Sequence, residues 1–404
     1  MTERIRNLTP EQQELLRRRM QNREPMPQSG TANSPSAPAV ALATPHTRRK
    51  VDFSLFFFSA DGNVGEDQRY RLLLEGARFA DANGFAAVWT PERHFQAFGG
   101  LYPNPSVLSA ALAMITEHVQ IRAGSLVLPL HSPVRVAEDW ALVDNLSHGR
   151  VGISFATGWH EHDYVIAPGN YEDRRELMFQ NIAVVRSLWA GEDVEMAGVG
   201  GKKVAVKTLP RPVQKELPIW VTVASPRTWQ RAGEAGANVL TAFSTSLDEL
   251  RQSIAGYRKA RMENGHDPRT GVVSLMLHTY VGTDLNEVRQ RVREPLKNYL
   301  QTYISQFRPM VAEGVVDPSS PEMQSLLEAV FEHYFEQNSL LGTPEKCISV
   351  IEKVSAAGVN DLACLVDFGL DHETTMEGLR HLAEVRRILE PQPAAAAVGR
   401  ESGS

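Results

Sequence analysis

A strand, helix, strand pattern in the first half of the chain constrains the fold more than any other sequence feature. Apolar, β-branched runs at 121–128 and 151–156 flank one amphipathic segment of suitable length for a single helix. Ser132 and Pro133 fit the N-cap and first turn of that helix, and Gly149 fits a C-terminal cap. Two strands joined by one helix pair in parallel, so this unit predicts an α/β fold.

Eight such β-rich runs alternate with helical periodicity and predict a (β/α)8 TIM barrel with insertions. The runs are 51–58, 86–90, 121–128, 151–156, 218–223, 237–242, 272–281 and 361–367. Eight strands suit a closed barrel better than a doubly wound open sheet. Two stretches exceed a simple barrel: residues 191–215 indicate an inserted hairpin, and residues 284–342 indicate extra helices. We expect both to border the active site, which lies at the carboxyl ends of barrel strands.

The composition divides the chain into three parts. Residues 1–20 predict a short helix, and residues 21–48 are rich in Pro, Ser, Ala and Thr. A segment of that composition buries too little apolar surface to offset its ordering entropy. We therefore interpret residues 1–48 as an N-terminal helix and flexible linker, 49–390 as the barrel domain and 391–404 as a disordered tail.

Charge and hydropathy argue against two classes of partner. The 404 residues carry a formal net charge of -6, and their basic residues form no stripe that would neutralise phosphates, so we expect no nucleic acid partner. No apolar run approaches the roughly 20 residues of a membrane span, so we expect no membrane association. The two cysteines, Cys347 and Cys364, lie in apolar stretches, and we expect a cytoplasmic protein.

Two motifs are weak indications of chemistry, and a third is absent. Residues 198–203 are glycine-rich, yet Lys203 stands where a dinucleotide fingerprint needs its third glycine, so a turn is favoured over a phosphate loop. His160 and His162 lack the i, i+4 spacing of a helical zinc motif, and we expect no metal. The chain has no Gly-x-Ser-x-Gly elbow to anchor Ser/His/Asp hydrolysis.

The tetrapeptide Ser225-Pro226-Arg227-Thr228 is a stronger indication. It follows an apolar strand and opens a helix that we expect over 228–234, where backbone N–H groups, two hydroxyls and a guanidinium could converge on an anion. The alternative is an ordinary Ser-Pro helix cap with a solvated arginine. Its place at a strand end makes a phosphate site as reasonable as the cap.

A histidine and several aromatic residues follow the first two predicted strands. His94 should stand at the barrel mouth, where it could act as an acid, a base or a hydrogen-bond donor. The alternative is a structural histidine paired with a carboxylate such as Glu92. Nearby aromatic residues could line an apolar pocket or belong to the core: Phe56, Phe57, Phe58, Phe95 and Phe98.

Together, five sequence pieces resemble the bacterial luciferase-like flavin monooxygenases over residues 51–385. The pieces are Glu92 to Gly99, Val127 to Pro129, Pro133 to Asp139, Gly149-Arg150 and Gly158-Trp159. The variant that begins with Phe53 to Phe57 and ends with Leu362 to Gly369 resembles the subgroup found on or beside polyketide and nonribosomal peptide synthetases. The segment from Leu8 to Leu16 resembles linkers of those synthetases.

The resemblance implies a flavin-dependent monooxygenase that uses reduced FMN and O2 to oxygenate an organic substrate. It places the active-site histidine on His94 and a non-proline cis peptide beneath the flavin at Gly124-Ser125. The remaining implied flavin contacts are Ala156 and Thr157 after the fourth strand, and Ser225 and Thr228 at the phosphate, with Arg227 as an added charge. The substrate pocket is then expected at Phe56, Phe57, Phe95, Phe98 and Trp159.

The implied partners follow from the same resemblance. No dinucleotide fingerprint is visible, so we expect a separate flavin reductase to supply reduced FMN. The substrate is expected to be an intermediate of polyketide or nonribosomal peptide biosynthesis, either a free small molecule or tethered to a carrier protein. Relatives are commonly homodimers. Two alternatives stay open: a deazaflavin-dependent oxidoreductase, and a non-catalytic docking module with the same fold.

Overall fold

The computed structural model describes residues 51–58, 69–243, 246–307 and 320–390. The predicted N-terminal helix and linker at 1–48 and the predicted tail at 391–404 lie outside these described residues.

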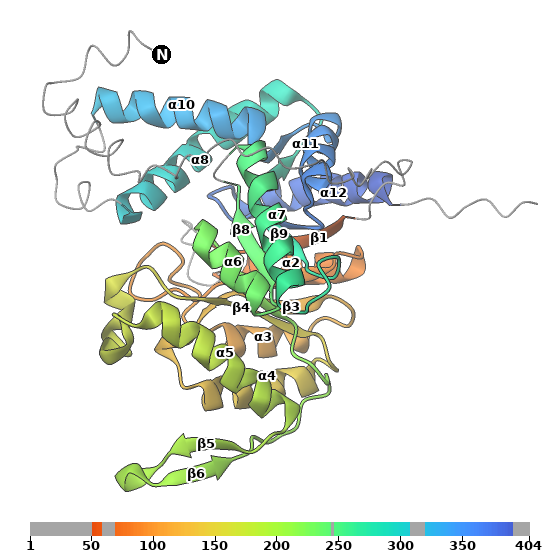
Figure 1. The fold of residues 1–404 in the computed structure, drawn as a ribbon. Helices are drawn as coiled ribbons and strands as arrows, with labels where there is room; N and C mark the ends of the chain where they lie inside the picture. Colours follow the sequence, from red (N-terminus) through yellow and green to blue (C-terminus); the bar gives the residue numbers. More distant parts are fainter. Residues whose placement is uncertain (1–50, 59–68, 244–245, 308–319, 391–404) are drawn as a thin grey trace, which may run out of the picture. The chain divides into compact units, whose positions relative to one another are not determined.

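The core of the molecule is a closed barrel of eight parallel strands (Figure 1), which confirms the predicted fold. The strands are β1 (Asp52–Phe56), β2 (Ala87–Thr90), β3 (Gln120–Val127), β4 (Val151–Ala156), β7 (Ile219–Thr222), β8 (Asn238–Ala242), β9 (Val273–Val281) and β11 (Asp361–Leu365). Pairing of β8 with β9 and of β11 with β1 closes the barrel. A short additional strand, β10 (Leu340–Gly342), extends the sheet beside the last residues of β9.

Helices follow the strands and cover the outside of the barrel. They are α2 (Arg71–Ala82), α3 (Pro105–Ala113), α4 (Pro133–Leu146), α5 (Arg174–Ala190), α6 (Pro226–Glu234), α7 (Leu247–Glu263), α11 (Pro344–Ala357) and α12 (His372–Leu389). Ser132 and Pro133 occupy the predicted N-cap and first position of α4, although the Ser132 side chain makes no capping hydrogen bond. Gly149 follows the end of α4 with φ +83° and donates its N–H to the Asp144 carbonyl at 2.8 Å.

Both predicted insertions are present, but only one borders the mouth of the barrel. Strands β5 (Val194–Ala197) and β6 (Lys203–Val206) form an antiparallel hairpin whose turn contains the glycine-rich residues 198–201, so the turn interpretation is confirmed. The hairpin lies between the end of α5 and the start of β7, and the chain after it bonds to Asp144 in the last turn of α4. These are amino ends of barrel strands, so the expectation that the hairpin borders the active site is wrong.

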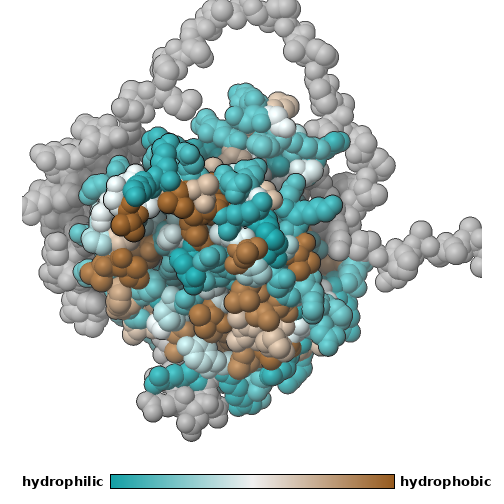
Figure 2. Space-filling view, turned by 90° about the horizontal axis from the view of Figure 1, so that it is seen from below, coloured by the Kyte–Doolittle hydropathy of each residue, from teal (hydrophilic) through white to brown (hydrophobic). Residues whose placement is uncertain are grey.

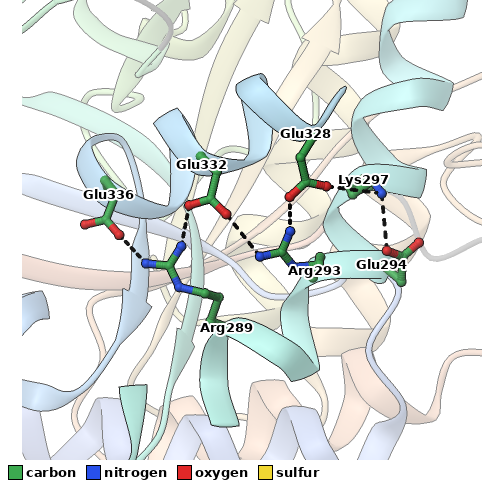
Figure 3. Close-up of polar contacts among 7 residues, drawn as sticks. All are labelled: Arg289, Arg293, Glu294, Lys297, Glu328, Glu332 and Glu336. Atoms are coloured by element: carbon green, nitrogen blue, oxygen red, sulfur yellow. Dashed lines mark hydrogen bonds and ion pairs between the residues drawn. The ribbon is translucent and has the colours of Figure 1, made fainter. Parts of the chain in front are cut away.

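The second insertion does lie at the carboxyl end of the barrel. It consists of α8 (Leu285–Phe307) and α10 (Pro321–Gln337), which follow β9 and lie side by side (Figure 1). Ion pairs cross between the two helices: Arg289 pairs with Glu332 and Glu336, and Arg293 pairs with Glu328 and Glu332 (Figure 3). Their guanidinium groups also lie over the rings of Phe335 and Phe331, at 4.3 and 4.8 Å from the centroids.

A polar and aromatic layer fills the amino end of the barrel interior. The Arg122 guanidinium lies between the rings of Trp89 and Trp220, 5.0 and 4.5 Å from their centroids. Asp361 accepts hydrogen bonds from Arg122 at 3.1 Å and from two serines, Ser54 at 2.8 Å and Ser274 at 2.6 Å. This layer blocks the bottom of the barrel, so a ligand can enter the interior only from the carboxyl ends of the strands.

The surface, the helices and the cysteines add three findings. Figure 2 shows one face of the molecule, on which hydrophobic residues form separate patches divided by hydrophilic ones. Within the described residues, no helix combines the length and the apolar character needed to cross a membrane. Cys347 and Cys364 are both buried and unpaired, and burial raises the pKa of the Cys347 thiol to about 12.

Candidate functional site

Glu92 is the polar centre of one side of the barrel mouth. Its carboxylate is fully buried just after β2 and accepts hydrogen bonds from Nε2 of His94 at 2.9 Å, Nε2 of His131 at 2.6 Å and the Val127 N–H at 2.6 Å. Burial opposes ionisation of this carboxyl, but the hydrogen bonds from His131 and His94 outweigh it and lower the pKa of Glu92. The Glu92 carboxylate thus connects the segment after β2 to the carboxyl end of β3.

His94 therefore has the carboxylate partner expected of a structural histidine. It also stands at the barrel mouth, as expected of an active-site histidine. Its side chain is 11% exposed, and its ring lies 5.6 Å from the ring of Phe95, whose backbone has φ +55°. His131 shares the same carboxylate. Burial disfavours its imidazolium, yet the hydrogen bond to Glu92 and the charges of Glu92 and Asp139 raise the pKa of His131.

The predicted cis peptide lies within the second half of β3. The Gly124-Ser125 bond is cis, and the register between β3 and β4 shifts there. A Cβ at Gly124 would lie 2.8 Å from the ring of Phe56 and 2.9 Å from that of Trp89, so only glycine fits. The Ser125 hydroxyl bonds to the Thr222 hydroxyl, which lies 2.8 Å from that of Ser154 on β4. These hydroxyls connect three neighbouring strands directly below the mouth.

The loop after β4 carries further predicted site residues. Ala156 and Thr157 are partly exposed, and the Thr157 carbonyl accepts a hydrogen bond from the Tyr164 hydroxyl at 2.5 Å. Trp159 is half exposed and covers the Arg93 guanidinium at 5.1 Å. Asp163 follows in the same loop, and burial raises the pKa of its carboxyl despite the nearby charges of His94 and Arg93. The loop of β4 thus faces the Glu92 side of the mouth.

The N-terminus of α6 places the predicted phosphate residues together. The helix begins at Pro226, two residues before the predicted start. The Ser225 Oγ accepts a hydrogen bond from the Thr228 N–H at 3.3 Å and lies 2.9 Å from the Thr228 hydroxyl, while Arg227 is exposed. The capping alternative is therefore present. An anion site at the same helix terminus stays a prediction.

A cavity of about 780 Å³ opens on the opposite side of the mouth. It joins the space over the ends of β8 and β9, bounded by Tyr299 and Tyr334 of α8 and α10, to a groove between α6 and α7 that reaches Glu263. Its charged lining residues, Glu249, Lys259 and Glu263, come from α7. Among the predicted site residues, Ser225 is the one that lines this cavity.

His278 is the most unusual residue of the cavity. It lies on β9, is 6% exposed, and its Nε2 has no hydrogen-bond partner among the described residues. Burial alone lowers the pKa of its imidazole to about 3. Its ring meets three aromatic rings edge to face, those of Tyr299 at 4.6 Å, Phe368 at 5.6 Å and Tyr334 at 5.7 Å.

The predicted pocket aromatics separate into different environments. Phe56 is buried in the barrel interior beside Trp89, whereas Phe57 points outward and packs on Gly76 of α2. Phe95 is 64% exposed. Phe98 is buried, and its ring lies 5.2 Å from that of Tyr299, which joins the Glu92 side of the mouth to the cavity wall.

Sequence reasoning missed His131, His278, Tyr299 and Tyr334. Alternation along β9 could have identified His278, because Ser274, Met276 and His278 share the face opposite the outer core residues Leu275 and Leu277. His131 and the two tyrosines gave no such signal, since their positions depend on contacts between distant segments. In the described part of the chain, no group of three or more His, Cys, Asp and Glu residues could hold a metal ion.

Comparison with known proteins gives concordant findings. The family model for luciferase-like monooxygenases matches residues 51–361. The oxygenase component of flavin-dependent trigonelline monooxygenase from Acinetobacter baylyi is 26% identical over 334 residues, which cover 81% of this chain and 91% of that protein.

Two solved structures with FMN or F420 share the fold. The oxygenating constituent of 3,6-diketocamphane monooxygenase from Pseudomonas putida, in complex with FMN, aligns with a TM-score of 0.67 at 18% identity and covers 85% of this chain and 99% of its own. An F420-dependent secondary alcohol dehydrogenase aligns with a TM-score of 0.65 at 21% identity, covering 85% and 100%.

Proposed function

Because the chain belongs to the luciferase-like monooxygenase family, we propose that it uses reduced FMN and O2 to oxygenate an organic substrate. The observation that carries this proposal is the cavity of about 780 Å³ that adjoins the N-terminus of α6 and reaches His278. A cavity of this volume is within the range that holds cofactors and drug-sized ligands. The flavin-dependent relative from Acinetobacter, aligned over most of both chains, favours a flavin.

The residues at the mouth fit an FMN molecule. Ser225, Arg227 and Thr228 would hold the phosphate, since a helix N-terminus attracts anions and both hydroxyls face each other there. Gly124 and Ser125 in the second half of β3, together with Ala156 and Thr157 at the end of β4, would lie against the ring system. When bound, reduced FMN supplies two electrons, so that one atom of O2 enters the substrate and the other leaves as water.

The proposed role of His94 is to donate or accept a proton at the mouth of the barrel. Its Nε2 hydrogen is held by the Glu92 carboxylate, so the ring orientation is fixed and the other nitrogen is directed away from Glu92. An imidazole held in this way can donate to or accept from a substrate or oxygen species at the mouth. Phe56, Phe95, Phe98 and Trp159 would exclude water and contact substrate. Phe57 packs on α2 and is the weakest of the proposed pocket residues.

We further propose the partners of this activity. The name of the Acinetobacter relative, an oxygenase component, supports a separate reductase that delivers reduced FMN. The sequence resemblance favours an intermediate of polyketide or nonribosomal peptide biosynthesis as substrate, free or tethered to a carrier protein, with a cytoplasmic homodimer as the working form.

The test combines oxygen uptake with product mass. The protein is incubated with FMN, a flavin reductase, NADH and candidate acyl- or aminoacyl-carrier proteins. The molecular mass of the tethered product is then measured. We expect a gain of one oxygen atom. His94→Ala should leave FMN affinity unchanged but lower product formed per O2 consumed, whereas exposed His118→Ala should change neither. Unchanged coupling in His94→Ala would remove His94 from the chemistry.

A second candidate is an F420-dependent hydride transfer, because the same fold occurs in an F420-dependent dehydrogenase. That enzyme would consume no O2. Substrate-dependent oxidation of reduced F420 without oxygen uptake would favour it over the monooxygenase.

A further inference from the structure

His278 is buried without the hydrogen bonds that a buried imidazole ordinarily makes. Its Nε2 is enclosed and has no hydrogen-bond partner within the described residues. An unpaired polar group in the interior is destabilising, so native proteins rarely retain one without a ligand, a water or a catalytic role to account for it. By contrast, Glu92 across the mouth has every contact that its carboxylate needs.

The surroundings of His278 define a binding compartment. Tyr299 and Tyr334 come from α8 and α10 and meet the imidazole edge to face, while Met276 and Leu300 complete the uncharged wall of the cavity. The charged residues of the cavity belong to α7. Since His278 itself is neutral at physiological pH, a charged ligand group placed here would find no counter-ion.

We propose that His278 is a specificity-determining residue, and that its compartment takes an uncharged, ring-bearing substrate whose hydroxyl or carbonyl group hydrogen-bonds to the imidazole. The proposal rests on the function proposed above and names the substrate class of the same site. The aromatic walls contribute ring contacts of the kind that favour planar ligands. A neutral imidazole can donate through one nitrogen and accept through the other, so it satisfies a hydroxyl or a carbonyl.

The test measures binding of matched probes to the FMN-loaded protein by calorimetry: 2-naphthol, naphthalene and 2-naphthoate. In the unchanged protein we expect 2-naphthol to bind about ten-fold more tightly than naphthalene, as one hydrogen bond to a buried group provides. The charged 2-naphthoate should bind most weakly. His278→Phe should reduce the preference for 2-naphthol to less than about three-fold, and His278→Gln, which keeps a donor and an acceptor, should retain part of it. His118→Phe, exposed before β3, is the matched control and should keep the full preference.

Equal binding of 2-naphthol and naphthalene by the unchanged protein would overturn the proposal without any variant. A preference that survives in His278→Phe would overturn it too. FMN affinity, measured in parallel, distinguishes failure of the proposed substrate class from failure of the proposed function. If the unchanged protein binds FMN but shows no preference among the probes, only the substrate class is contradicted. If the unchanged protein does not bind FMN, the proposed function itself is contradicted.

Discussion

Glu92 and His278 are both buried at the carboxyl end of the barrel, yet their polar atoms meet opposite surroundings. The Glu92 carboxylate accepts three hydrogen bonds from β2 and β3 neighbours. His278 is surrounded by rings, and its Nε2 has no partner among the described residues. The Glu92 carboxylate is saturated with hydrogen bonds, and the Nε2 of His278 has none in the part of the chain that the structure describes.

This difference distinguishes groups whose orientation is fixed by contacts within the protein from groups whose hydrogen-bond partner would come from a ligand. A saturated buried network fixes the orientation of its members, because breaking any contact leaves a charge unpaired in a low dielectric. An unsaturated group in a cavity gains its partner only on binding. The Glu92 side is therefore interpreted as the rigid frame around His94, and the His278 side as the compartment that recognises substrate.

The largest expected effect comes from breaking the saturated side. Glu92→Leu removes the shared acceptor of Val127, His94 and His131, and should lower the free energy of unfolding by about 3 to 5 kcal/mol. Urea unfolding at pH 7 measures it. Glu138→Leu is the control, because its ion pair with Arg135 is exposed and should contribute less than about 1 kcal/mol. Similar losses in both variants would show that the buried Glu92 contacts contribute no more to stability than an exposed ion pair does.

The proposed phosphate site at the N-terminus of α6 should show the next largest effect. Ser225→Ala combined with Thr228→Val should weaken FMN binding ten-fold or more, since hydrogen bonds to a charged group contribute about 1.5 to 3 kcal/mol each. Riboflavin lacks the phosphate and should bind both proteins alike. Flavin fluorescence titration measures both ligands. Equal weakening for FMN and riboflavin would place the phosphate elsewhere.

The pH dependence of the Glu92 network gives a smaller, signed effect. The pKa of His131 is raised, so its contribution to stability is complete below its ordinary value of about 6.5 and is lost as pH rises through the raised value. The pKa of Glu92 is lowered, so its contribution is complete above about 4.5 and is lost as pH falls through the lowered value. The stability advantage over His131→Gln should thus be larger at pH 5.5 than at pH 9. An advantage that grows toward pH 9 would reverse the assignment.

The smallest effect should follow deletion of residues 1–48. This segment contains neither Glu92 nor His278 and lacks any candidate flavin ligand. The truncated protein should keep its melting temperature within about 2 °C and its FMN affinity, because linkers of this composition contribute few core contacts. Turnover of a carrier-tethered substrate should fall, while that of a free mimic should not. Aggregation or loss of FMN would show instead that this segment packs on the barrel.

The sequence was sufficient for the barrel but not for the contrast across its mouth. All eight strands could be predicted, because β-branched runs and helical periodicity are local signals. The position of the β5–β6 hairpin was predicted wrongly, although chain order could have placed it, because a connection from a helix to the next strand lies at the amino ends of barrel strands. The orientation of Phe57 is a missed local signal, because strand alternation after inward-facing Phe56 directs it to α2.

Contacts between distant segments could not be predicted in the same way. Glu92 was considered only as a partner of His94, and its bond to His131 joins residues 39 apart in sequence. Tyr299 and Tyr334 meet His278 only because α8 and α10 fold back over the end of β9. Burial without a partner is a property of the folded molecule, so the sequence of β9 alone could indicate an inward histidine but not an unsatisfied one.

The central claim is that this mouth binds reduced FMN for reaction with O2, and an anaerobic titration followed by admission of oxygen tests it most directly. The protein is titrated with reduced FMN and, separately, with reduced F420, and oxygen consumption is then followed. The account predicts that reduced FMN binds at least about ten-fold more tightly than reduced F420 and that the bound flavin is oxidised when O2 is admitted. Tighter binding of reduced F420, with no consumption of O2, would contradict it.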